Sequence, residues 1–558
     1  MRMTSLFLFA AVLLAPTASA SSAVAAPAKN QALPQILTYI SNGWTTLTRS
    51  MSDCGTFSDP KTQEKSALYL PADFSAPAGL RQVATKCGVS VKALPAATHK
   101  LGVIDVSSLH PQGLLYLPEP YVVPGGMFNE MYGWDSYFII RGLLEEGQLA
   151  LARDMVDNFL FEIEHYGAVL NANRTYYLTR SQPPFLTSMI RAVYNAEKTK
   201  GQGDRTWLEK AYRDATQDYQ FWTEPPHLAG TTGLSRYYDF GQGPVPELGN
   251  ETTQYYRTVV QYFLLHPEGS QPYLIPVPAG TTSPNIIGPQ FSLVMGPTGA
   301  NSQNDSTTLD KLALTAEFYK GDRSMRESGF DVTFRFGPFG AATPDFAPVG
   351  LNCLLYKEEK DLQWMSGELG LAKDSAQWES RAAARQGKIN RYLWDSKHGL
   401  YFDFNFAGES RSYYSFATTF YPLWTGVASP EQAQAVVQNL HEFEQPGGVV
   451  TSVNDTGGQW DYPYGWAPIQ LITIEGLRLY GYQKDADRLS LKFLSMVLEN
   501  FSKDGTIREK YNVVTRSSET SVTAGYKKNV IGFGWTNGVF LTLLHELPKG
   551  EAMLLGGH

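Results

Sequence analysis

Apolar residues recur along most of this chain with the period of an α-helix. Leu149, Phe159 and Ile163 belong to one series whose members, three or four positions apart, share one helical face. A second series covers 433–443, and Ser429 precedes it in the position of a helix N-cap. The same spacing predicts helices at 207–222, 307–319, 351–369, 376–394, 469–480, 486–497 and 536–547. The chain is therefore predicted to be mostly helical.

Long loops separate these helices, and the alternation typical of strands is sparse. Glycine, proline and aromatic residues dominate the loops 225–246, 266–299 and 447–468. Only 399–404 and 411–414 suggest a short hairpin, and no Gly/Ser linker interrupts the interior. We therefore predict one all-α domain over 31–550, a toroid of paired helices whose long loops gather at one end, where a site could form.

The N-terminus has the pattern of an export signal. Arg2 precedes an apolar run over 6–14, and Ala18 and Ala20 fit the small-residue cleavage rule. This predicts a signal peptide over 1–20, cleaved near Ala20, a disordered leader over 21–30, and a periplasmic or secreted protein. No later stretch is apolar for about 18 residues, so no membrane association is expected.

Composition narrows the classes of ligand. The 558 residues carry a net charge of −8 with no long basic run, which argues against nucleic acid as a partner. Aromatic residues make up 13% of the chain, as is usual in proteins that handle sugars. The nine histidines lack metal-ligand spacing, and no P-loop, dinucleotide or GxSxG motif is present. We expect a small-molecule sugar ligand, no metal, no cofactor and a monomeric protein.

The three cysteines leave one question open. Cys54 and Cys87 could form a disulfide in an oxidising compartment, or both could remain free. Cys353 lies in an apolar segment and is expected to be a buried small hydrophobe.

Two early motifs carry candidate sugar-binding residues. PGGMFNEMYGWDSY, at 124–137, contains the candidates Phe128, Tyr132, Trp134 and Asp135. Aromatic faces stack on the C–H faces of sugars and carboxylates bind hydroxyls, although a buried aromatic turn with solvated acids would give the same pattern. NANRTYYLTRSQPPF, at 171–185, adds Asn171, Arg180 and Gln182, and its alternative is a surface loop with a structural arginine.

Later motifs supply a possible pair of catalytic carboxyls. Asp331 lies in a Gly-aromatic stretch flanked by Arg326 and Arg335, and it is either a general acid or one half of an Asp–Arg pair. Arg335 is also a candidate sugar contact. Glu509 precedes GFGWTNGV, at 532–539, and is either a second catalytic carboxylate or an exposed glutamate. Aromatic and polar candidates near them are Trp460, Asp461 and Trp466, in QWDYPYGWAP at 459–468, and Trp535. Paired carboxyls with sugar-stacking aromatics are what glycoside hydrolysis requires.

At these motifs the chain resembles the trehalases of glycoside hydrolase family 37. QWDYPYGWAP matches the family's second signature in full, PGGMFNEMYGWDSY matches the first except at one position, and RSQPPF, ESGFD, EKY and GFGWTNGV follow in the family's order. The resemblance implies an (α/α)6 barrel that hydrolyses α,α-trehalose to two glucoses with inversion. It places Asp331 at the general acid and Glu509 at the general base. It also implies sugar contacts for Phe128, Trp134, Asp135, Asn171, Arg180, Glu247 and Trp466.

Three departures from the family pattern bear on the substrate. Met127 and Val245 stand where the family has arginines, and the family's glycine-rich lid, which carries a Glu, is replaced by 517–530. Glu519 or Lys527 could fill the space of the missing acid. A trehalase is therefore the first interpretation. An inverting α-glycosidase acting on another α-linked di- or oligosaccharide is the second, and a non-catalytic sugar-binding barrel is the third.

Overall fold

The computed structural model describes residues 32–58, 67–270, 272–277, 287–292, 311–526 and 528–555. The predicted signal peptide and leader lie outside these residues. Within them, no helix is both long enough and apolar enough to cross a membrane.

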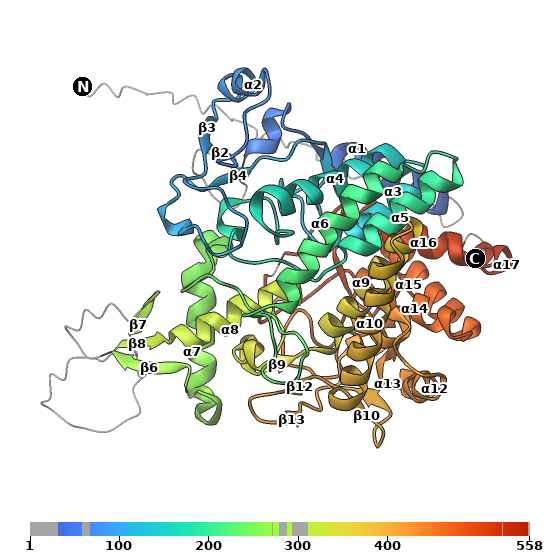
Figure 1. Cartoon of the computed structure of the whole chain (residues 1–558). Coiled ribbons are helices and arrows are strands. Elements are labelled where there is room, and N and C mark those ends of the chain that lie inside the picture. The colour runs from blue at the N-terminus through green and yellow to red at the C-terminus, as the bar shows by residue number, and fades with distance from the viewer. Residues whose placement is uncertain are drawn as a thin grey trace, which may run out of the picture.

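Six helices form a closed inner ring (Figure 1). They are α3 (Asp135–Glu145), α5 (Leu186–Thr199), α9 (Val349–Glu368), α11 (Tyr421–Thr425), α14 (Ala467–Leu479) and α16 (Gly534–Glu546). Each packs on the next in this order, and α16 packs back on α3, so the ring has no open edge.

A second set of helices surrounds the ring. It consists of α4 (Leu149–Tyr166), α6 (Arg205–Thr223), α10 (Ala372–Tyr392), α12 (Pro430–Gln438), α15 (Gln483–Asp504) and α1 (Ala32–Leu47). In sequence, α4, α6, α10, α12 and α15 each follow their inner partner, whereas α1 packs on α15 and on the last inner helix, α16. The architecture is the predicted (α/α)6 barrel.

Burial distinguishes the two sets of helices. Every residue of α16 from Gly534 to Leu543 is buried, as expected for a helix enclosed on all sides. In α10 the buried residues are Trp378, Ala382, Arg385 and Ile389, a single stripe at spacings of three and four. Outer helices therefore show the amphipathic period in the sequence, and inner helices show continuous apolar segments.

Most predicted helices are confirmed, with two exceptions. The helix predicted over 433–443 is interrupted: Ser429 caps α12 in a capping box as predicted, but α12 ends at Gln438 and α13 (Leu440–Phe443) follows. The helix predicted over 307–319 is wrong in its described part, because β8 (Lys311–Leu314) is a strand and α8 (Ala316–Glu327) begins only afterwards. A short apolar run fits either structure, and pairing with neighbouring strands decides it here.

A second hydrophobic core lies beside the barrel, at the lower left of Figure 1, between α6 and α9 in sequence. In it α7 (Thr252–Leu265) and α8 pack on an antiparallel sheet of β6 (Leu274–Val277), β8 and β7 (Gln290–Ser292). Its centre includes the buried side chains of Tyr256, Phe263 and Phe318. One side of α7 in this unit lines the cavity described below.

The N-terminal segment forms a small parallel sheet. Its strands are β3 (Ser90–Ala93), β2 (Ala67–Leu70) and β4 (Gly113–Leu115), next to α2 (Leu80–Lys86). Cys54 and Cys87 form a disulfide across this unit, which settles the open question in favour of pairing. Cys353 is free and buried, as expected.

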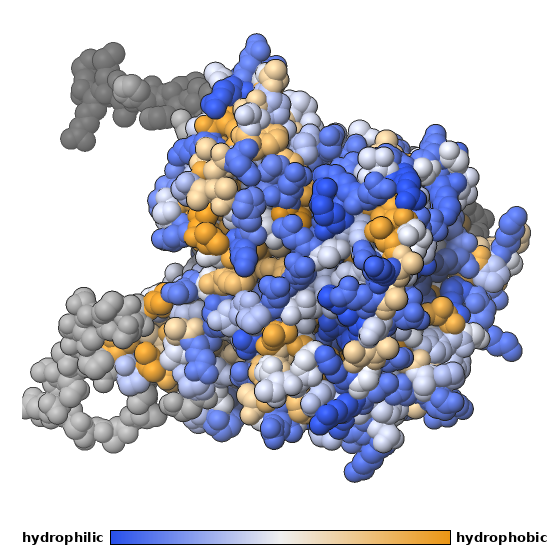
Figure 2. Space-filling view, viewed as in Figure 1, coloured by the Kyte–Doolittle hydropathy of each residue, from blue (hydrophilic) through white to orange (hydrophobic). Residues whose placement is uncertain are grey.

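Short pairs of hydrogen-bonded strands connect the loops to one another. The hairpin predicted from 399–404 and 411–414 forms only in part, between β12 (Phe404–Asn405) and β13 (Ser410–Arg411), and β12 also pairs with β9 (Phe346–Ala347). The other pairs are β1 (Thr48–Arg49) with β5 (Tyr121–Val122), β10 (Trp394–Asp395) with β11 (Leu400–Tyr401), β14 (Glu444–Gln445) with β15 (Gly448–Val449), and β16 (Tyr464–Trp466) with β17 (Lys510–Asn512). Hydrophilic residues cover most of the face shown in Figure 2, with only scattered apolar patches.

Candidate active site

A cavity of about 800 Å³ lies at the N-terminal ends of the inner helices. The loops that lead into α3, α5, α14 and α16 form its walls, together with α7 and the segment after α8. Most of the predicted site residues line it: Phe128, Tyr132, Trp134, Asp135, Asn171, Arg180, Gln182, Glu247, Asp331, Trp460, Glu509 and Trp535. Loops far apart in sequence are thus gathered at one end of the barrel, as predicted.

Tryptophans from two loops and from the first turn of α16 form an aromatic wall of the cavity. Trp134 lies 5.8 Å from both Trp460 and Trp535, measured between ring centroids. Trp466 stacks on Trp460 at 3.8 Å with nearly parallel planes and is fully buried. The wall is therefore rigid and suited to stacking against a sugar ring.

Three predicted contact residues do not line the cavity. Trp466 supports Trp460 from behind. Arg335 forms a buried ion pair with Asp403. Asp461 accepts hydrogen bonds from side chains and a backbone amide of neighbouring loops, including the Tyr414 hydroxyl at 2.9 Å. Other residues inside the protein satisfy the polar groups of all three side chains, so these side chains hold the loops rather than touch a ligand.

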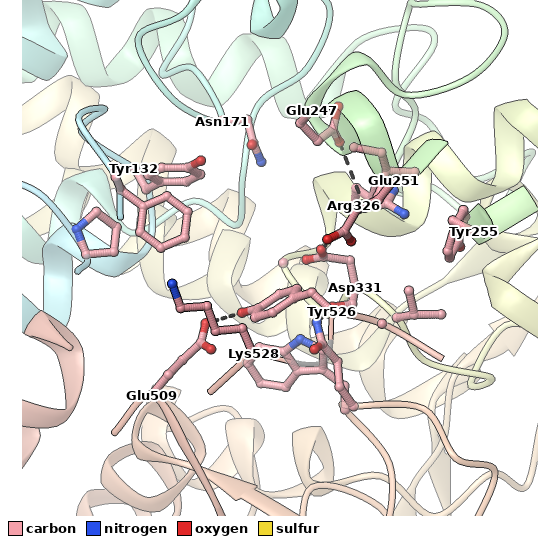
Figure 3. Close-up of a pocket in the computed structure, with 18 of the residues that line it drawn as sticks. Tyr132, Asn171, Glu247, Glu251, Tyr255, Arg326, Asp331, Glu509, Tyr526 and Lys528 are labelled. Carbon is pink, nitrogen blue, oxygen red and sulfur yellow. Dashed lines mark hydrogen bonds and ion pairs between the residues drawn. The ribbon is translucent and has the colours of Figure 1, made fainter. Parts of the chain in front are cut away.

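Asp331 faces two arginines across the cavity. Nη1 of Arg326 lies 3.6 Å from Oδ2 of Asp331 (Figure 3). Nη2 of Arg180 lies 2.5 Å from Oε1 of Glu247. Burial raises the pKa of Asp331 to about 6, although Arg326 and Arg180 oppose the rise. Burial also acts on Glu247, but there the same two arginines prevail and lower its pKa to about 2. Asp331 can thus hold a proton near neutral pH, while Glu247 is ionised.

Glu509 has a different environment. Oε1 accepts a hydrogen bond from the Tyr526 hydroxyl, and Oε2 lies 3.5 Å from the buried Nζ of Lys510. Burial raises the pKa of Glu509, while Lys510 and Tyr526 lower it by stabilising the charged form. Burial and the charge of Glu509 raise the pKa of Asp135 well above its ordinary value, so Asp135 is suited to donate a hydrogen bond.

Several cavity residues were not predicted from the sequence. Arg326 was noticed only as a neighbour of Asp331, and the other side chains on the wall include Tyr177, Glu251, Gln254, Tyr255, Gln459, Tyr526 and Lys528. Gln459, Tyr526 and Lys528 lie in loops, where no periodicity reports which side chain faces inward. Gln254 and Tyr255 lie on α7, outside the motifs that indicate a sugar site, and Arg326 lies in the last turn of α8. Of the two candidates for the missing lid acid, Glu519 is exposed and outside the cavity, and Lys527 lies outside the described residues.

In the described part of the chain, no group of three or more His, Cys, Asp or Glu side chains is arranged to hold a metal ion.

The family model for trehalase matches residues 28–262 and 298–548 of this chain. The chain belongs to the trehalase family. Among solved structures, a neutral trehalase from Saccharomyces cerevisiae superposes with a TM-score of 0.75 at 31% identity, covering 94% of this chain and 96% of that one.

Curated relatives give the same family. A probable trehalase of Saccharomyces cerevisiae is 36% identical over 466 residues, which are 76% of this chain and 54% of the relative. A cytosolic neutral trehalase of Kluyveromyces lactis is 38% identical over 472 residues, 78% of this chain and 58% of the relative. The chain thus spans somewhat more than half the length of the curated relatives it matches.

The names of these relatives correct the predicted localisation. Those from Saccharomyces cerevisiae, Kluyveromyces lactis and Neurospora crassa include cytosolic neutral trehalases, so the prediction of a periplasmic or secreted protein is wrong, and a bacterial periplasmic subtype is not supported. A charged residue before a short apolar run describes only local composition, which is why that pattern misled the prediction.

Proposed function

We propose that this protein hydrolyses α,α-trehalose to two glucoses with inversion, using Asp331 as general acid and Glu509 as general base. The observation that carries the proposal is that both carboxyls line one aromatic-walled cavity of a trehalase-family barrel. The different surroundings of the two carboxyls support the division of roles. Burial raises the pKa of Asp331 to about 6, which suits a proton donor, while the Tyr526 hydroxyl and Lys510 stabilise the charged form of Glu509 against the effect of burial.

In the proposed reaction, Asp331 donates its proton to the glycosidic oxygen as the bond from that oxygen to C1 breaks. Glu509 removes a proton from a water molecule, whose oxygen forms the new bond to C1 on the opposite face. The anomeric centre is thereby inverted, and Asp331 and Glu509 recover their starting states by returning the proton through solvent. Inversion requires the carboxyls to stand roughly 6.5–9.5 Å apart, leaving room for the water.

Unpaired polar atoms in the cavity support a polyhydroxylated ligand. Nη2 of Arg326 and Oε2 of Glu247 are buried and make no hydrogen bond within the described residues. An unsatisfied buried polar group costs about 1–3 kcal/mol, which sugar hydroxyls would recover on binding. Arg326 also places a guanidinium in the cavity, which offsets part of the loss of the arginines expected at Met127 and Val245.

Met127 favours a second candidate function. It lines the cavity where the family has an arginine, whereas Val245 is fully buried outside the cavity. A methionine makes that part of the wall more apolar, which would suit an α-linked disaccharide other than trehalose. This second candidate keeps the same barrel and the same pair of carboxyls.

Glucose release from purified protein tests both candidates. The protein is offered trehalose beside a panel of other α-linked disaccharides. We expect release from trehalose, with α- and β-glucose appearing by NMR in equal initial amounts, because the attacked C1 is inverted to β while the departing glucose keeps its α configuration. Release only from another sugar would favour the second candidate, and release from none would contradict both.

Substitution of Met127 separates the candidates further. Met127→Arg should lower KM for trehalose several-fold if a missing guanidinium limits binding, since a charged hydrogen bond contributes about 1.5–3 kcal/mol. A fall in kcat/KM would instead mean that this wall is shaped for another sugar.

A further inference from the structure

Tyr526 lies in the segment that departs from the family pattern, and its hydroxyl donates a hydrogen bond to Oε1 of Glu509. The other polar atoms of Glu509 are also held. Its amide donates to the Val530 carbonyl at 3.0 Å, and its carbonyl accepts from Nε1 of Trp535 at 3.1 Å. Oε2 lies 3.5 Å from Nζ of Lys510. Tyr526 therefore supplies the contact that fixes one carboxylate oxygen.

Tyr526 is itself fixed by the loop on which it stands. Gly525 has a φ of +127°, and a Cβ there would lie 2.8 Å from Cδ of Gln459, so a side chain is excluded. The amide of Gln459 donates to the Ala524 carbonyl at 3.1 Å. Nζ of Lys510 lies 4.0 Å from the centre of the Tyr526 ring, a cation–π contact.

The same contacts connect the two proposed catalytic carboxyls. Lys510 donates to Oε1 of Gln459 at 3.1 Å, and Nε2 of Gln459 donates to the carbonyl of Asp331. Figure 3 shows the Tyr526 ring lying between Glu509 and Asp331. A movement of Tyr526 would therefore disturb the contacts that hold both carboxyls in place.

We propose that Tyr526 is a positioning residue that orients the Glu509 carboxylate and holds it ionised for the activation of water. The inference rests on the proposed function of Glu509 as the base. It assigns a role to the segment 517–530, which lacks the acid-bearing glycine-rich lid of the family. The neutral Tyr526 hydroxyl donates a hydrogen bond and so stabilises the negative charge on Glu509. A second carboxylate at this position would instead repel that charge.

The charge around Glu509 fixes the expected sign. The titratable side chains that face it are Lys510, Tyr526, Asp135, Asp331 and Lys528. Tyr526 and Lys510 lower the pKa of Glu509 against burial. Without the Tyr526 hydroxyl, the carboxylate loses a charge-assisted hydrogen bond while burial remains, so the pKa of Glu509 rises. The base must be ionised, and the acidic limb of activity then moves to higher pH.

The pH profile of Tyr526→Phe tests the inference. We expect the acidic limb of kcat/KM for trehalose to move up by about 1–2 pH units. Below the new limb, kcat should fall about 10- to 100-fold, with KM changed less than about threefold. Tyr480→Phe is the matched control, since its hydroxyl donates to the Ala428 carbonyl at 2.6 Å outside the cavity. Its profile should equal that of the unmodified protein.

A second measurement does not depend on activity. The pKa of Glu509 is read by 13C NMR of glutamate-labelled protein, with Glu509→Gln to assign the resonance, before and after Tyr526→Phe. An equal pKa in both proteins overturns the inference, whatever the substrate. If the pKa rises but the unmodified protein releases no glucose from trehalose, the proposed function fails and the role of Tyr526 stands.

Discussion

Two carboxyl side chains in one cavity differ in the groups that contact them. Burial raises the pKa of both, and each has a cation nearby: Nη1 of Arg326 lies 3.6 Å from Asp331, and Nζ of Lys510 lies 3.5 Å from Glu509. Glu509 in addition accepts a hydrogen bond from the Tyr526 hydroxyl. This difference comes from short-range contacts between the carboxyls and neighbouring side chains, which no sequence motif predicts. Two predictions belong to this scale.

Replacing the proposed acid should abolish turnover without abolishing binding. Asp331→Asn keeps the size of the side chain but cannot donate an acidic proton, so kcat for trehalose should fall about 10²- to 10⁴-fold. Isothermal titration should still detect the sugar. Glu519→Gln is the control, because that acid is exposed and outside the cavity. Persisting turnover would mean that Asp331 is not the acid.

The pKa of Asp331 predicts the basic limb of the pH profile. An acid with a pKa of about 6 is protonated below that pH, so kcat/KM should fall as pH rises through about 6. Arg326→Gln removes a positive charge that lowers this pKa, and the limb should therefore move to higher pH. Arg205→Gln, at an exposed surface position, should leave it in place. A limb that moves to lower pH would contradict the assignment.

Among the elements, the contact between α3 and α16 is the tightest point of the ring. Gly142 and Gly538 face each other there, and a Cβ on Gly142 would lie 2.4 Å from Cα of Gly538. Glycine at both positions lets the two backbones touch, which joins the loop before α3 to the loop before α16. Trp134 precedes α3 directly and Trp535 lies in the first turn of α16, so the glycine pair also sets the spacing of the aromatic wall.

Adding one methyl group at this crossing should destabilise the barrel. Gly142→Ala forces the helices apart and should lower the free energy of unfolding by about 1–3 kcal/mol or more. Gly387→Ala on α10 is the control, since nothing lies within 4 Å of its Cβ, and it should raise that free energy by roughly 0.5–1 kcal/mol. Urea unfolding measures both. Equal effects would refute the packing argument.

Over the whole molecule, one disulfide secures the N-terminal sheet while the barrel core holds a free thiol. Cys54 and Cys87 close a loop of sequence separation 33, and Cys353 is buried on an inner helix. The cross-link lies away from the cavity, so its loss should affect stability and not catalysis.

Thiol titration checks this arrangement. The native protein should react with no thiol reagent, the denatured protein with one equivalent, and the denatured and reduced protein with three. Replacing both Cys54 and Cys87 by serine should lower stability by roughly 3–4 kcal/mol, from the entropy of the closed loop. Two or more reactive thiols in the unreduced protein would show that the bond does not form.

The sequence predicted the barrel and most of the cavity because those features have a repeating or motif-bound signal. Amphipathic period marks outer helices such as α4 and α10, and capping residues mark the start of α12. The pattern failed at Lys311–Leu314, where pairing with β6 and β7 overrides a run that fits either structure.

Within the site, motifs identify loops but not the direction of each side chain. Trp460 and Trp466 stand in one motif, yet only Trp460 faces the cavity. Tyr526 gave no signal at all, because its importance comes from a contact with Glu509 that folding creates. Local pattern could not supply that contact.

The pairing of α1 with α16 has a consequence for synthesis on the ribosome. Ring closure joins one of the first described helices to one of the last, and α3 finds its tightest partner in α16 as well. A growing chain that has emerged only as far as α15 would expose the apolar faces of α1 and α3 to the cytosol. Vectorial folding therefore cannot complete this barrel, and ring closure has to wait until α16 has been translated.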